Sequence, residues 1–76
     1  MVADIRRLIA SQPFVPFTIH LADGGSVRVP TVDHVHVFPT GNRVLVVHDD
    51  DSYELMSPLL ISRISVDGGA IQRPSS

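Results

Sequence analysis

The chain has 76 residues, no cysteine and a net charge of −2 at pH 7. This length allows one hydrophobic core, and the missing thiols exclude disulfides and favour a reducing, cytoplasmic location. A content of 43% hydrophobic and 18% charged residues excludes a disordered chain, and the acidic balance disfavours nucleic acid as a partner. No apolar run is long enough to cross a bilayer and no signal-peptide pattern is present, so we expect no membrane partner.

The first expected element is a short helix over residues 3–11. Apolar residues recur at spacings of three and four, which is typical of one helical stripe: Val2, Ile5, Leu8 and Ile9. Pro13 ends the helix because the residue before a proline is pushed towards extended geometry. Since so short a helix is marginal in water by itself, we expect it to dock on the rest of the chain.

Two strands joined by a tight turn follow. Residues 17–22 alternate between apolar and polar side chains, the period-2 pattern of a half-buried strand. The Asp23-Gly24-Gly25 segment is a strong hairpin signal, because these residue types tolerate positive φ. The return strand covers residues 26–29, with Val27 and Val29 pointing inwards, and the proline after it ends the ladder.

A second hairpin is expected from residues 33–38 and 43–48. Its return strand contains four apolar residues in succession: Val44, Leu45, Val46 and Val47. Such a run is typical of a strand that is covered on both faces, so we predict that it is the central strand. One cover is the core, and the other is the helix or a second copy of the chain. We therefore take Val44, Leu45, Val46 and Val47 as candidate interaction residues.

The chain then forms a polar turn, a short strand over residues 53–56 and a last strand over residues 59–66, whose register the pattern leaves open. Residues 1–66 form one domain, and residues 67–76 read as a flexible tail. The fold class is α+β, mainly β. It has a short N-terminal helix and a five- or six-stranded antiparallel meander curled into a small barrel.

Three histidines raise the question of a metal site. His34 and His36 are two residues apart on an expected strand, so their side chains leave the same face, and His48 is a third candidate ligand. If Phe38 pairs with Arg43, His48 lies on the opposite face, and only a register slip or a bulge brings it round. The metal site is therefore the less favoured interpretation, and we expect no cofactor.

The sequence contains no catalytic constellation. It has no cysteine, its serines lack a nucleophile-elbow pattern, and its paired glycines lack the spacing of a phosphate loop. A domain of this size also leaves little room for a substrate pocket of about 300 Å³. We expect that the protein is not an enzyme.

The stretch from Gln12 to Gly24 carries a P-F-x-P-F motif, then a strand that ends in Asp-Gly, all preceded by a short helix with arginines. In this it resembles a set of small bacterial proteins of unknown function. That resemblance implies no activity.

The order of elements, with Leu60-Ile61-Ser62-Arg63-Ile64 in the last strand, resembles the Sm-like fold of the bacterial RNA chaperone, a small barrel of SH3-like shape. The resemblance implies an oligomer that binds RNA. Pro30 departs from it by interrupting the second strand.

Three functional hypotheses follow. The first is a non-enzymatic module that associates with itself or with another protein. The second is an Sm-like RNA-binding oligomer, and the third is a histidine-based metal-binding domain.

Overall fold

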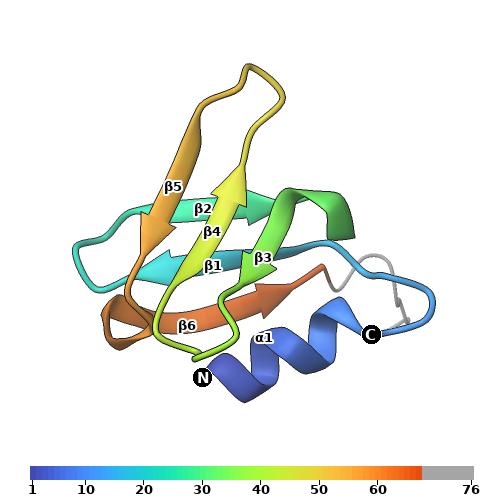
Figure 1. Ribbon diagram of the computed structural model, residues 1–76, viewed down its shortest axis with the longest axis horizontal. Helices are drawn as coiled ribbons and strands as arrows, with labels where there is room; N and C mark the ends of the chain where they lie inside the picture. The colour runs from blue at the N-terminus through green and yellow to red at the C-terminus, as the bar shows by residue number, and fades with distance from the viewer. Residues whose placement is uncertain (68–76) are drawn as a thin grey trace.

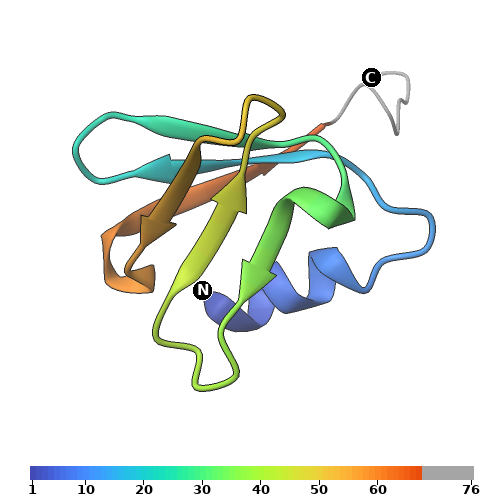
Figure 2. The same ribbon diagram turned by 45° about the horizontal axis from the view of Figure 1, so that its top comes forward.

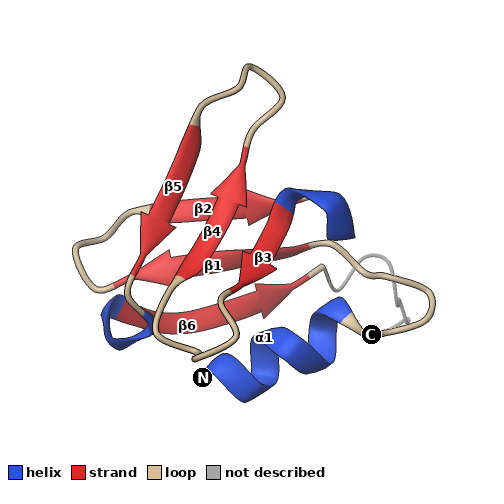
Figure 3. Ribbon diagram, viewed as in Figure 1, coloured by secondary structure: helices blue, strands red, loops and turns tan. Residues whose placement is uncertain are grey.

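A computed structural model gives the structure of the protein and describes residues 1–67. It contains one N-terminal helix and six antiparallel strands, as the sequence predicts, together with two short 3-10 turns (Figure 3). The elements are α1 (Val2–Ile9), β1 (Phe17–Leu21), β2 (Ser26–Val29), η1 (Val32–His34), β3 (Val35–Val37), β4 (Val44–Val47), β5 (Tyr53–Met56), η2 (Pro58–Leu60) and β6 (Ile61–Val66).

The strands form two three-stranded sheets (Figure 1). Sheet A has the order β2-β1-β6 and sheet B the order β3-β4-β5. No strand pairing joins the two sheets within residues 1–67, so the predicted barrel is not closed. The prediction of one continuous meander is also wrong, because β6 pairs with β1 and not with β5. Pro30 supplies a physical reason, because it has no N–H to donate at the point where the second strand would have to continue into sheet B.

The core lies between the two sheets. Alternation along the strands sends one side chain in two towards it, and the fully or almost fully buried ones come from the helix and from all six strands: Ile5, Phe17, Ile19, Val27, Val29, Val35, Val44, Val46, Met56 and Ile61. No polar or charged residue of the described chain is buried. The core is thus held together by apolar packing alone.

The helix closes one side of this arrangement. It lies beside β6 and β3, each an edge strand of its sheet (Figures 1 and 2). Ile5 is fully buried, while Leu8 and Ile9 are half-buried against the core, which confirms the predicted stripe. Arg6 fixes the helix to the end of β3, since its guanidinium donates to the carbonyl oxygen of Phe38 at 3.0 Å.

Two segments that we predicted as strand form 3-10 turns because side chains bond to the local backbone or to each other. Before β3, His34 donates its N–H to the Thr31 carbonyl, and its ring bonds to the Thr31 hydroxyl at 2.7 Å. Before β6, the Ser57 hydroxyl accepts the N–H of Leu59, and a proline occupies the first turn. Such local bonds compete with the sheet ladder and shorten both strands.

The register of the last strand is set by a bulge. Leu21 pairs with Ile61, but His20 pairs with Arg63, so Ser62 is the extra residue. The Ser62 hydroxyl donates to the His20 carbonyl at 3.1 Å. Ile61 therefore faces the core, and the strand beyond the bulge returns Ile64 to the same face.

Asp67, the first residue of the segment predicted as a tail, is bonded to the domain. The Asp67 N–H donates to the Pro16 carbonyl at 3.0 Å, and its carboxylate accepts two bonds from Arg28, at 2.7 and 2.6 Å. Residues 68–76, the rest of that segment, lie outside the described residues.

Candidate functional site

The two sheets differ in the chemistry of the face that each turns away from the core. The outer face of sheet A is polar throughout, with side chains from β1, β2 and β6: Thr18, His20, Ser26, Arg28, Arg63 and Ser65. His20 bonds to the Ser65 hydroxyl across the strands at 2.8 Å. A polar outer face of this kind is what an antiparallel sheet in contact with water normally presents.

The outer face of sheet B, in contrast, carries large apolar side chains. The strand register places Leu45 directly opposite Leu55, and Val47 directly opposite Tyr53, on the side away from the core. We call these four residues the apolar face. Tyr53 is 65% and Leu55 53% exposed, and the two β4 residues are half-buried. In Figure 1 sheet B lies in front of sheet A, and no helix or strand of the described chain lies in front of it.

Charged side chains stand at the two ends of the apolar face. Arg43 precedes β4 and lies opposite Phe38, whose N–H donates to the Arg43 carbonyl. Asp49 follows β4, and its carboxylate oxygen Oδ1 lies 2.8 Å from Nε2 of His34. The side chain of Asp49 is 92% exposed. The face is therefore apolar in its centre, cationic at one end and anionic at the other.

The structure divides the four candidate interaction residues into two pairs. β4 is the central strand of its sheet, as the sequence predicts. Val44 and Val46 are 0% exposed and belong to the core, so they cannot contact a partner while the domain is folded. Leu45 and Val47 point outwards. The expectation that the helix covers this second side is wrong, because α1 packs at the side of the two sheets.

Sequence reasoning missed Tyr53 and Leu55, which are the most exposed members of the apolar face. Their segment alternates Tyr, Glu, Leu and Met, so either set could have faced the core. Only the pairing with β4 decides, because it sets Met56 opposite the buried Val44. The length of the turn between β4 and β5 could have predicted this pairing, because turn length fixes the register of a hairpin.

The three candidate metal ligands do not form a site. The observed register is the one in which Phe38 pairs with Arg43. Both ring nitrogens of His34 have partners, Thr31 and Asp49. His36 is exposed beside Leu45, and His48 lies 3.6 Å from a carboxylate oxygen of Glu54. Residues 1–67 contain no group of three histidine or acidic side chains that could hold a metal ion.

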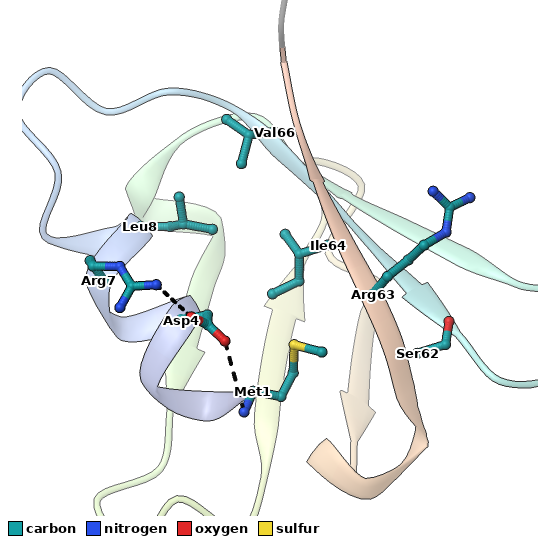
Figure 4. Close-up of a pocket in the computed structure, with 8 residues that line it drawn as sticks. All are labelled: Met1, Asp4, Arg7, Leu8, Ser62, Arg63, Ile64 and Val66. Carbon is teal, nitrogen blue, oxygen red and sulfur yellow. Dashed lines mark hydrogen bonds and ion pairs between the residues drawn. The ribbon is translucent and has the colours of Figure 1, made fainter.

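A groove of about 340 Å³ lies between α1 and β6 (Figure 4). It is larger than we expected for so small a domain, because the helix stands off the edge of sheet A. Met1, Leu8 and Ile64 point into the gap, whereas Ser62 and Arg63 extend to the other side of β6 (Figure 4). Asp4 is held by Arg7 and lies 4.0 Å from the N-terminal amine. The groove offers an apolar lining beside an already paired carboxylate, with no arrangement of nucleophile and base.

Hydrogen bonds shift the pKa of three surface groups, none of which belongs to the apolar face. The hydrogen bonds and charge of Arg28 lower the pKa of Asp67, and in return Asp67 raises the pKa of Arg28. In the turn after β4, bonds from the Ser52 hydroxyl and N–H lower the pKa of Asp50. These shifts describe stabilised surface carboxylates, which stay ionised at neutral pH.

No helix of the described chain is long and apolar enough to span a membrane. Comparison with known proteins gave no match: no family model matches the sequence, and no curated protein or solved structure reaches significant similarity.

Proposed function

We propose that the protein is a non-enzymatic interaction module, and that it binds a protein partner through the apolar face of sheet B. The observation that carries this proposal is the contrast between the two sheets. Sheet A exposes only polar side chains on its outer face, whereas sheet B exposes Tyr53 and Leu55 beside Leu45 and Val47. The same fold thus keeps one surface suited to water and one suited to a partner.

The arrangement of the face supports binding over simple exposure. Single exposed apolar residues are normal on proteins, and Val32, 41% exposed in η1 between Thr31 and Asp33, is one of these. The four residues of the apolar face instead form two directly opposed cross-strand pairs, so their side chains adjoin. Tyrosine also supplies a large contact area at a low cost in conformational entropy, because its side chain has only two χ angles. The four residues therefore offer a partner one contiguous patch.

The test is photocrosslinking in the organism that produces the chain. A photoreactive phenylalanine derivative replaces Tyr53, and in a matched control it replaces Ser26, which is exposed on the outer face of sheet A. We expect a covalent product with one defined protein from position 53 and none from position 26. The added substitution Leu55→Asp should abolish that product while the circular dichroism spectrum stays unchanged. No product at position 53, or the same products at both positions, would exclude the proposal.

A further inference from the structure

We infer that the partner of the apolar face is a second copy of this chain, stacked face to face with its β4 antiparallel to β4 of the first copy. This inference rests on the proposed function of the face and identifies what covers it. Its basis is the order of residues along β4 and beside it: Arg43 immediately precedes the strand, Leu45 and Val47 point outwards from it, and Asp49 lies in the turn two residues after it. In the sequence, the cation lies three residues before Val46 and the anion three residues after it.

Symmetry turns that order into complementarity. Two copies that stack face to face are related by a two-fold axis lying in the contact plane. With the axis perpendicular to β4 and above Val46, the strand of the second copy runs in the opposite direction. Arg43 then meets Asp49 of the partner subunit at both ends, and Leu45 meets Val47 of the partner subunit in the middle. The same axis keeps β5 over β5, so that Leu55 meets Tyr53 of the partner subunit.

The alternative orientation is opposed by charge. With the axis parallel to β4, Arg43 faces Arg43 of the partner subunit at one end. At the other end Asp49 faces Asp49 of the partner subunit. Both contacts are then repulsive, and specificity between arrangements often comes from such repulsion. Arg43 and Asp49 lie six positions apart, which corresponds to about 20 Å in extended chain and exceeds the screening length of physiological salt, so we treat each end as acting independently.

The groups at each end are available for these contacts. The guanidinium of Arg43 donates to the carbonyl of its neighbour Asn42 and forms no ion pair within residues 1–67. Asp49 bonds to His34 through Oδ1, and the exposure of its side chain leaves Oδ2 accessible. Sheets that stack face to face lie about 10 Å apart with their strands within about 30° of alignment, which lets the four apolar side chains of each copy interlock.

The experiment measures the dimer Kd by analytical ultracentrifugation over a wide concentration range. We expect a reversible dimer for the unaltered chain, and a Kd roughly tenfold higher or more for Arg43→Asp and for Asp49→Arg, each of which places like charges at both ends. The double variant R43D/D49R restores opposite charges and should return the Kd towards that of the unaltered chain. Arg63→Asp changes the net charge by the same amount as Arg43→Asp, but on the outer face of sheet A, and should leave the Kd unchanged.

Orientation is tested separately by disulfide trapping, which is clean because the chain has no cysteine. Leu45→Cys mixed with Val47→Cys should form the mixed disulfide faster than either variant crosslinks with itself. A chain that stays monomeric at the highest concentration overturns the inference, and so does a Kd that the double variant fails to restore. If photocrosslinking at position 53 then captures a different protein, the proposed function stands and only the identity of the partner is wrong.

Discussion

Adjacent valines in β4 provide a direct test of which side chains face the core. Val46 is 0% exposed, whereas Val47 is half-buried on the apolar face. Valine to alanine removes two methyl groups, worth about 1.6 kcal/mol of transfer free energy, and in a closed core the cavity raises the loss to about 2–3 kcal/mol. At Val47 no closed cavity forms and part of the side chain already contacts water, so the loss is about 1 kcal/mol or less.

The comparison is internally controlled. Both substitutions exchange the same residue types on the same strand, so the lower strand propensity of alanine affects both equally. A domain of 76 residues has a free energy of unfolding of roughly 4–11 kcal/mol, so Val46→Ala removes a large part of it. The assay is urea denaturation monitored by circular dichroism, with the chain diluted until the midpoint no longer depends on concentration. We expect Val46→Ala to be the less stable variant by about 1–2 kcal/mol.

Equal losses for the two variants under dilute conditions would refute this reasoning. They would mean that β4 is buried on both sides within one copy of the chain, as the sequence pattern alone suggests. The apolar face would then not exist as a surface, and the proposals built on it would fail together.

Three further predictions concern other parts of the molecule. Asp67→Asn removes the ion pair with Arg28. Because folding lowers the pKa of Asp67 from 3.8, the pair stabilises the fold above that pH, and this stability is lost as the pH falls through the lower pKa of the folded state. When melting temperature is measured during acid titration, the variant should therefore lose less stability than the unaltered chain. Gly24→Ala meets no atom within 4 Å but has a φ of +94°, so urea denaturation should show a loss of about 1 kcal/mol from backbone strain alone. Zinc should not bind stoichiometrically in calorimetry, because His34 already bonds to Thr31 and Asp49; a tight equimolar site would contradict the placement of the histidines.

Much of the secondary structure was predictable because it depends on local chemistry. The helix stripe and the Asp-Gly hairpin are encoded within a few residues, and all six strands lie where alternation or apolar runs place them. The exact strand ends were not predictable. They depend on bonds such as that between the Ser57 hydroxyl and the Leu59 N–H, which compete with pairing over one or two residues.

The candidate site was less predictable, because a face is defined by pairing between strands. Leu45 and Val47 look equivalent to Val44 and Val46 in the sequence, since all four are apolar. Which pair turns outwards depends on the side of sheet B that meets sheet A, a tertiary choice that no local pattern encodes. The bulge at Ser62 was unpredictable for the same reason. It turns Ile64 towards the core only because β6 pairs with β1, a strand about 40 residues earlier in the sequence.

The pairing of β1 with β6 has a consequence for how the chain acquires its structure during synthesis. β3, β4 and β5 follow one another, so sheet B can assemble as soon as its segment is available. β1 can likewise pair with β2 as soon as residue 29 has been made, but its other edge stays unpaired until residue 66 has been made, since Phe17 also pairs with Val66. Closing so long a loop is slow compared with forming hairpins, so we expect the pairing of β1 with β6 to be the last step and to complete sheet A. Until that step the edge of β1 and part of the core are exposed, and the chain is most prone to aggregation during this interval.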